Sequence, residues 1–342
     1  MIENVTPVAV LGAGNWGTVV AHLVSLTGHK VLLWTRNLKQ CDEINQNHTN
    51  QKYTHELLLA DAITATTDLE HTVAAARVII MMIPTQGFRG IVREISAWVT
   101  PEQIIIHGTK GLELVTHHRM SEIILQETCI RQLGVLSGPN IANEILQGLP
   151  AGSVIASRFP RVVHEGTRVL ASSKLRIFQN SDVSGVEFSG AFKNVIAIAA
   201  GIAHAMKLGD NTKAMLITRC ISEMAKLGVC YGAQSMTFFG MAGIGDLVAT
   251  CASPHSRNGR LGAALVSGKT LEQAQKDLGM VAEGVNTAKT AYEMSQKNNL
   301  ETPLIDHVYR IIYENLAPKK AVESLMEIPP SADVSQALLP SL

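Results

Sequence analysis

The sequence predicts an α/β protein in which an N-terminal, doubly wound, mostly parallel sheet is followed by an all-helical C-terminal domain. Three observations predict this class. A glycine-rich turn follows the first apolar run, short β-branched runs then alternate with amphipathic stretches, and the β pattern fades after residue 179. Such alternation is typical of parallel strands joined by helices that cover both faces of a sheet.

The run Val8–Thr18 reads as a short apolar strand, a glycine turn and the beginning of a helix. Gly12 permits a tight turn, Gly14 lets the backbone approach a pyrophosphate, and Gly17 lets the helix pack closely on the strand. A diphosphate would then lie against free N–H groups at the positive end of the helix dipole. In this context the GxGxxG pattern predicts a Rossmann-type dinucleotide site, with a purely structural turn as the alternative.

Further elements follow from hydrophobic periodicity. Helices dominate from residue 189 onward, and the helix expected at Asn194–Met206 is apolar all round, which indicates a buried central helix. The expected strands are Val31–Trp34, Ile63–Ala65, Val78–Ile83, Ile104–His107, Val135–Leu136, Ser153–Ser157 and Leu175–Gln179. The other expected helices are Asp210–Gly228, Leu271–Leu278, Val285–Asn298 and Ile305–Glu314.

The length of 342 residues suggests two domains. We expect a dinucleotide-binding domain over 1–185, a helical substrate-binding and catalytic domain over 186–328, and a loose Pro/Ser-rich tail over 329–342. The hydrophobic content of 46% is ample for sizeable cores.

Composition narrows the class of partner. The chain carries 29 basic and 29 acidic residues, so no overall field recruits nucleic acid or an anionic membrane. The longest apolar segment, Val195–Ala203, is too short to span a bilayer, and no basic region precedes the first strand, so no signal peptide is expected. The five cysteines form no CxxC pair, which favours a reduced, cytoplasmic protein. Metal-ligand spacings are missing, and no metal is expected.

The end of the second strand normally reads the adenosine ribose, and residues 34–37 contain no carboxylate. Arg36 can pair with a 2′-phosphate or stack on adenine, so NADP(H) is admitted; a solvated residue at a helix start is the alternative. Glu283 could reach a ribose hydroxyl from the other domain, which leaves NAD(H) open.

Two lysines occupy unusual positions. Lys110 ends an apolar run at the carboxyl edge of a parallel strand, where open α/β sheets bind ligands. Lys193 is expected at the beginning of the most apolar helix, where partial desolvation would lower its pKa and suit it to proton transfer. The alternative is a snorkelling lysine whose stem covers apolar surface.

A third cluster contains Asp246 and the run Ser256-Arg257-Asn258. The planar fork of Arg257 matches phosphate oxygens and Asn258 adds an amide donor, which favours a phosphorylated substrate. Asp246 is either a helix cap, the more frequent role of an isolated aspartate here, or a carboxylate that orients a lysine and a substrate hydroxyl.

Seven segments, in this order, resemble bacterial NAD(P)-dependent sn-glycerol-3-phosphate dehydrogenases, and the resemblance extends to about residue 325. They are residues 12–17 (GAGNWG), 110–113 (KGLE), 137–144 (SGPNIANE), 193–201 (KNVIAIAAG), 216–219 (LITR), 243–247 (GIGDL) and 256–258 (SRN). The lysine motifs and the Ser-Arg-Asn run are the specific ones, because ordinary Rossmann enzymes lack them.

The resemblance implies a role for each matching residue. Lys193 corresponds to the family's proton acceptor, and Lys110 and Asp246 complete the implied catalytic set. Beside Gly12, Gly14 and Gly17, the implied cofactor contacts are Asn15, Trp16, Arg36, Lys110, Ala142, Arg257, Val281 and Glu283. The implied substrate contacts are Lys110, Gly138, Asn140, Lys193, Asp246, Ser256, Arg257 and Asn258.

The resemblance further implies reversible hydride transfer between NAD(P)(H) and dihydroxyacetone phosphate, which yields glycerol 3-phosphate for phospholipid synthesis. Three positions depart from the family pattern: Asn140 stands for a usual Ser or Thr, Asn15 for a usual Ser, and Gly259 for a basic residue. Two alternatives remain: a related β-hydroxyacid or 6-phosphogluconate dehydrogenase, of which Ser-Arg-Asn is not the signature, and a catalytically silent dinucleotide sensor. The cofactor preference and the oligomeric state stay open, with a homodimer as one option.

Overall fold

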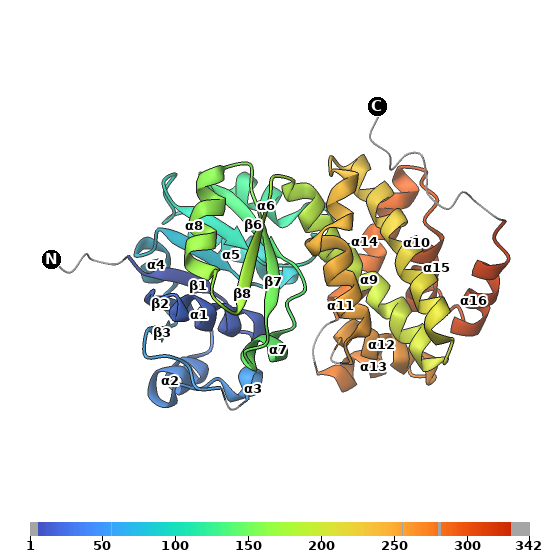
Figure 1. Ribbon diagram of the computed structural model, residues 1–342, viewed down its shortest axis with the longest axis horizontal. Helices are drawn as coiled ribbons and strands as arrows, with labels where there is room; N and C mark the ends of the chain where they lie inside the picture. Colours follow the sequence, from blue (N-terminus) through green and yellow to red (C-terminus); the bar gives the residue numbers. More distant parts are fainter. Residues whose placement is uncertain (1–5, 56, 255, 280–281, 330–342) are drawn as a thin grey trace. The chain divides into compact units, whose positions relative to one another are not determined.

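The computed structural model describes residues 6–55, 57–254, 256–279 and 282–329. Within these residues the chain forms two compact units (Figure 1). Unit 1 contains the described parts of Met1–Thr109 and Met120–Val183, and unit 2 contains Lys110–Arg119 together with the described part of Ser184–Leu342. The tail expected beyond residue 329 lies outside the described residues.

Unit 1 contains a sheet of eight strands in the order β3-β2-β1-β4-β5-β6-β7-β8. All neighbouring strands are parallel except β6 and β7, so the predicted mostly parallel, doubly wound sheet is confirmed. The strand order reverses between β1 and β4, which is the topological switch point where such sheets bind ligands. The strands are β1 (Val8–Leu11), β2 (Val31–Trp34), β3 (Ile63–Thr66), β4 (Val78–Met81), β5 (Ile104–His107), β6 (Leu133–Ser137), β7 (Ala151–Ala156) and β8 (Leu175–Asn180).

Helices of unit 1 pack on this sheet through apolar stripes. In α5, Phe88, Ile91, Val92 and Ile95 are buried at i, i+3, i+4 and i+7 spacing, which places them on one helical face. The helices of this unit are α1 (Asn15–Leu26), α2 (Leu38–Asn47), α3 (Gln51–Thr54), α4 (Leu69–Ala74), α5 (Thr85–Ile95), α6 (Met120–Glu127), α7 (Ala142–Leu146) and α8 (Pro160–Leu170).

From Ser184 onward the described part of unit 2 contains helices and no strand, as predicted, whereas its segment Lys110–Arg119 is not helical and contains an isolated bridge between Leu112 and Arg119. Its helices are α9 (Val183–Ala205), α10 (Gly209–Cys230), α11 (Asp246–Ala252), α12 (Arg257–Val266), α13 (Leu271–Leu278), α14 (Glu283–Lys297), α15 (Pro303–Tyr313) and α16 (Pro318–Met326). A 3₁₀ helix, η1 (Ser235–Phe239), and a π-helical turn, η2 (Met241–Gly245), join α10 to α11.

Helix α9 begins well before the expected start at Asn194, so the prediction that Lys193 begins this helix is wrong. Lys193 lies near its midpoint. The first half of α9 contains Gly, Ser and Phe, which are weak helix formers, and burial overrides their propensity. Phe188 and Phe192, both buried, stack with ring centroids 5.3 Å apart.

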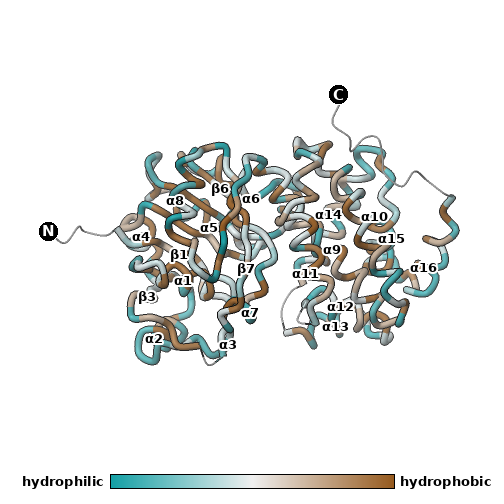
Figure 2. The backbone as a smooth tube through the Cα atoms, viewed as in Figure 1, coloured by the Kyte–Doolittle hydropathy of each residue, from teal (hydrophilic) through white to brown (hydrophobic). Residues whose placement is uncertain are grey.

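The full length of α9 also corrects the estimate of its apolar extent. Among the described residues it is the one helix whose length and composition would allow it to cross a membrane. Its most apolar window is 94% buried inside the structure, and Figure 2 shows it as a largely hydrophobic segment. Its apolar surface is therefore used in packing against the rest of unit 2.

Helix α12 approaches α9 at backbone contact distance. A Cβ added to Gly201 of α9 would lie 2.0 Å from the carbonyl oxygen of Gly259. A Cβ added to Gly262 would lie 2.2 Å from the carbonyl oxygen of Ile198. Side chains larger than hydrogen would force these helices apart at both points. This close packing brings the beginning of α12 beside the middle of α9, where the candidate site residues Asn258 and Lys193 lie.

Candidate active site

The glycine turn of unit 1 has the geometry that a dinucleotide site needs. Gly12 has φ +108°, and a Cβ there would lie 2.7 Å from the carbonyl oxygen of Met82. A Cβ on Gly17 would lie 1.7 Å from the carbonyl oxygen of Gly12. Gly14 is the N-cap of α1 without a side-chain cap, and a Cβ there would meet no atom of the described residues beyond its chain neighbours within 4 Å. The beginning of α1 therefore has no side-chain cap and leaves space at Gly14 for a ligand to approach the backbone, as an anion site requires.

Two residues in the first turn of α1 were assigned to the cofactor from the resemblance. Asn15 is the first residue of the helix and is exposed. The indole Nε1 of Trp16 is buried and makes no hydrogen bond to any described residue. A buried donor without a partner costs free energy unless a ligand or water satisfies it. The turn and this donor together fit a bound dinucleotide.

The residues after β2 leave the choice of cofactor open. Arg36 is exposed, and its guanidinium carbon lies 5.8 Å from the centroid of the Trp34 ring. Asn37 caps α2 by accepting a hydrogen bond from the N–H of Gln40. Arg36 is thus placed directly before the N-cap of α2, with its side chain exposed.

The segment from the end of β6 to the first residue of α7 holds three more assigned residues. Gly138 has φ +137°, and a Cβ would lie 3.0 Å from the carbonyl oxygen of Gly152. Asn140 accepts a hydrogen bond from the buried Ser153 hydroxyl at 2.6 Å through Oδ1, while its Nδ2 is buried without a partner among the described residues. Ala142 is the first residue of α7.

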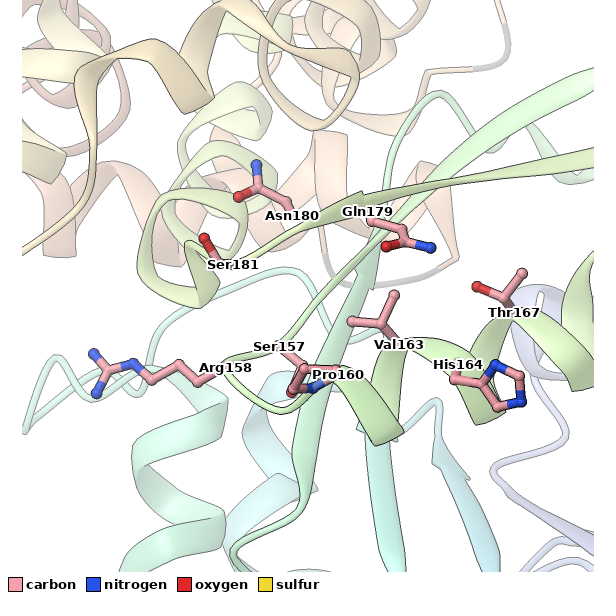
Figure 3. A pocket seen from close by; sticks show the side chains of 9 residues that line it. All are labelled: Ser157, Arg158, Pro160, Val163, His164, Thr167, Gln179, Asn180 and Ser181. Atoms are coloured by element: carbon pink, nitrogen blue, oxygen red, sulfur yellow. The ribbon is translucent and has the colours of Figure 1, made fainter.

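Unit 1 also contains an open cavity of about 490 Å³ between α8 and the end of β8 (Figure 3). Its lining includes Pro160, Val163 and Thr167 from α8 and Gln179 from β8. None of the predicted site residues lines this cavity. The predicted site is therefore not the cavity of Figure 3.

In unit 2 the structure brings the two predicted lysines onto one carboxylate. Lys110 Nζ lies 2.7 Å from Asp246 Oδ2, and Lys193 Nζ lies 2.6 Å from Asp246 Oδ1. Thr250, one helical turn beyond Asp246, accepts a hydrogen bond from Lys193 Nζ at 2.7 Å. Asp246 therefore acts as a bridging carboxylate, and the helix-cap interpretation is wrong.

Burial sets the electrostatics of this Lys110–Asp246–Lys193 cluster. The side chains of Lys193 and Asp246 are only 9% and 3% exposed. Burial lowers the pKa of Lys193 to about 8, because the attraction of Asp246 only partly offsets desolvation and Lys110 repels a second cation. Burial alone would raise the pKa of Asp246, yet the two ammonium groups hold it below its usual value. The cluster thus pairs a stable carboxylate with an ammonium that can release its proton near neutral pH.

The run Ser256-Arg257-Asn258 begins α12. Ser256 is its N-cap and accepts a hydrogen bond from the N–H of Gly259, a structural role that sequence reasoning missed. Arg257 is exposed in the first turn of the helix. Asn258 is buried and donates a hydrogen bond from Nδ2 to Asn194 Oδ1 at 3.0 Å.

Three residues in these clusters were not predicted. Thr250 follows Asp246 at the i+4 spacing that places both on one helical face, and Asn194 directly follows Lys193, so both could have been found from the sequence. Gly284, whose N–H donates to Asn258 Oδ1, gave no such signal.

Two further predicted cofactor contacts lie at or near the beginning of α14. Glu283 is its first residue and is half-buried, and Val281 lies outside the described residues. The described residues contain no group of three His, Cys, Asp or Glu side chains that could hold a metal.

A Rossmann-type unit with an unblocked glycine turn, joined to a helical unit with a buried lysine–aspartate pair, defines the class of two-unit NAD(P)-dependent oxidoreductases. Comparison with known proteins identifies the family. Residues 7–162 match the N-terminal family of NAD-dependent glycerol-3-phosphate dehydrogenase, and residues 182–323 match its C-terminal family. The chain belongs to the NAD-dependent glycerol-3-phosphate dehydrogenase family.

Individual relatives agree with this assignment. A glycerol-3-phosphate dehydrogenase [NAD(P)+] of Acinetobacter baumannii (strain SDF) is 41% identical over 97% of this chain and 92% of its own. One from Halothermothrix orenii is 40% identical over 97% of both chains. The crystal structure of glycerol-3-phosphate dehydrogenase from Coxiella burnetii is 34% identical, with a TM-score of 0.90 over 94% of this chain and 99% of that one. The recognition made from the sequence is confirmed.

Proposed function

We propose that this protein interconverts dihydroxyacetone phosphate and sn-glycerol 3-phosphate by hydride transfer with NAD(P)(H). The observation that carries the proposal is the buried Lys193 ammonium on Asp246, a proton carrier whose pKa of about 8 suits exchange near neutral pH. The identity of the substrate is inferred from the family, because the family and the relatives are named glycerol-3-phosphate dehydrogenases.

The nicotinamide, when bound, supplies or accepts the hydride at the carbon that carries the substrate oxygen. In the reducing direction the ammonium of Lys193 donates a proton to the carbonyl oxygen. In the oxidising direction the neutral amine of Lys193 removes the hydroxyl proton. Asp246 holds Lys193 in place, and the second ammonium, Lys110, favours proton release from it.

Binding of the substrate is proposed to use Arg257 and Asn258 for the phosphate. A guanidinium can donate two parallel N–H hydrogen bonds to phosphate oxygens. Because these bonds fix the orientation of the phosphate, they also align the reacting carbon. From the resemblance we propose that Gly138, Asn140 and Ser256 also contact the substrate. The proposed cofactor contacts are Gly12, Gly14, Asn15, Trp16, Gly17, Arg36, Lys110, Ala142, Arg257, Val281 and Glu283.

The cellular context is proposed from the same family. A cytoplasmic enzyme that makes glycerol 3-phosphate would supply phospholipid precursors. The sheet-containing and helical domains are proposed to extend over 1–185 and 186–328, and the homodimer remains a proposal. The function is tested by mixing the protein with NADPH or NADH and dihydroxyacetone phosphate, and following loss of the reduced cofactor. Equal activity with the unphosphorylated carbonyl compound that corresponds to a β-hydroxyacid, or none with dihydroxyacetone phosphate, would overturn it.

The Arg36→Ala variant tests how this chain treats the 2′-phosphate. If Arg36 pairs with that phosphate, its loss should weaken NADPH binding by about 1.5–3 kcal/mol and NADH binding far less. Dissociation constants for both cofactors, measured by titration, check this. Arg158→Ala, which removes another exposed arginine of unit 1, is the control and should change neither constant. Equal losses for both cofactors in Arg36→Ala would show that Arg36 stacks on adenine or is structural.

A further inference from the structure

A chain of amide groups connects three helices of unit 2 beside the Lys110–Asp246–Lys193 cluster. The N–H of Gly284, in the first turn of α14, donates to Asn258 Oδ1 at 3.1 Å. Asn258 Nδ2 in turn donates to Asn194 Oδ1 at 3.0 Å. Asn194 is the residue next to Lys193 on α9, so the chain of bonds ends directly beside the proposed proton carrier.

The Gly284 N–H fixes the direction of this chain. A backbone N–H can only donate, so the atom of Asn258 that faces Gly284 must be its oxygen. The nitrogen of Asn258 is therefore turned to the opposite side, where it uses one N–H on Asn194 and keeps a second for another acceptor. Without the Gly284 contact, the Asn258 amide could turn over and present an acceptor instead, which would repel a phosphate.

Only glycine fits at position 284. A Cβ there would lie 2.6 Å from the backbone oxygen of Asn194, 2.7 Å from Asn258 Oδ1 and 3.0 Å from the Cδ1 of Ile198. The Asn194 oxygen belongs to the backbone of α9 and cannot move aside as a flexible side chain would. Any larger residue would therefore move the beginning of α14 away and break the contact with Asn258.

We propose that Gly284 is a positioning residue for phosphate recognition: its N–H locks the Asn258 amide so that a donor is presented to the substrate phosphate. The proposal rests on the proposed function, in which Asn258 binds that phosphate. Because Glu283, a proposed cofactor contact, immediately precedes Gly284, the first turn of α14 serves both ligands.

The test compares dihydroxyacetone phosphate with unphosphorylated dihydroxyacetone at saturating NADPH. Gly284→Ala should lower kcat/KM for the phosphorylated ketone by about tenfold, the scale of one oriented hydrogen bond, through a fall in kcat together with a rise in KM. The same variant should lower kcat/KM for dihydroxyacetone much less, because a shift of Glu283 would affect both ketones equally and only the phosphorylated ketone uses Asn258. Gly228→Ala is the control, because its Cβ would lie 2.3 Å from the buried ring of Phe238 and the contacts it would meet do not involve Asn258. It should lower Tm without changing the ratio of the two efficiencies.

A double-mutant cycle separates an action through Asn258 from general damage. In an Asn258→Ala background, Gly284→Ala should cause no further loss of phosphate discrimination, because the group that it positions is already missing. Additive losses would overturn the proposal. If Gly284→Ala does not fold, Asn194→Ala removes the other support of the amide and should give the same selective loss. An inactive wild type would refute the proposed function, whereas an active wild type with an unchanged ratio in these variants would refute only this inference.

Discussion

Replacing Lys193 with methionine should lower turnover by about 10²–10⁴-fold, the usual contribution of a general acid or base. Methionine keeps an unbranched apolar stem at this buried position of α9 but carries no proton. Cofactor affinity should stay nearly unchanged, because the proposed dinucleotide turn belongs to unit 1. Steady-state turnover with dihydroxyacetone phosphate, together with a titration of NADPH, checks both statements.

The Tm of the variant must be measured in parallel, because Lys193→Met removes one of the two cations that Asp246 bridges. Lys110 still lies 2.7 Å from Asp246 Oδ2, so the carboxylate keeps a partner. Lys226→Met, which changes a half-buried lysine of α10 in the same unit, is the matched control and should keep normal turnover. A folded Lys193→Met variant within tenfold of wild-type turnover would remove Lys193 from the role of proton carrier.

Arg257→Lys should lose catalytic efficiency although the positive charge is kept. A lysine ammonium cannot form the two parallel N–H bonds of a guanidinium, so the loss should be large for dihydroxyacetone phosphate and small for dihydroxyacetone. Turnover should fall together with a rise in KM, because a phosphate that aligns the reacting carbon acts in the transition state. Both ketones are assayed at saturating NADPH, since Arg257 is also a proposed cofactor contact.

The control for this prediction is Arg260→Lys, which makes the same change at another exposed position of α12. It should leave both efficiencies close to the wild-type values. If Arg257→Lys lowered both ketones by the same factor, Arg257 would be a cofactor or structural residue. The phosphate site would then have to be assigned to Asn258, Arg260 or the beginning of a helix.

Much of the fold was predictable because several strands, such as Val78–Met81 and Ile104–His107, are short, buried runs rich in β-branched residues. The strand Val31–Trp34 and the helix Leu271–Leu278 were predicted with their observed limits. The beginning of α9 was missed, since its first half is held helical by burial and not by local propensity. The grouping of Lys110–Arg119 with unit 2 was also hidden, because contacts between segments distant in sequence decide it.

Some residues of the candidate site were also predictable from the sequence, whereas others were not. The glycine turn, both lysines and Ser-Arg-Asn carry local signals that a sequence can show. Asp246 alone looked more like a cap, and only the folded chain places it between Lys110 and Lys193. The role of Gly284 depends on backbone atoms of α9 that approach it in space, and no sequence spacing encodes that approach.

The pH dependence of kcat/KM in both directions tests the central claim, that Lys193 carries the proton, most directly. Its pKa of about 8 predicts that reduction, which needs the ammonium, falls as pH rises through about 8. Oxidation of glycerol 3-phosphate needs the neutral amine and should rise over the same interval. Working above about pH 7 keeps the substrate phosphate in its dianionic form, since its second pKa is about 6. Opposite slopes near pH 8 are the predicted result, and slopes of the same sign in both directions would contradict the account.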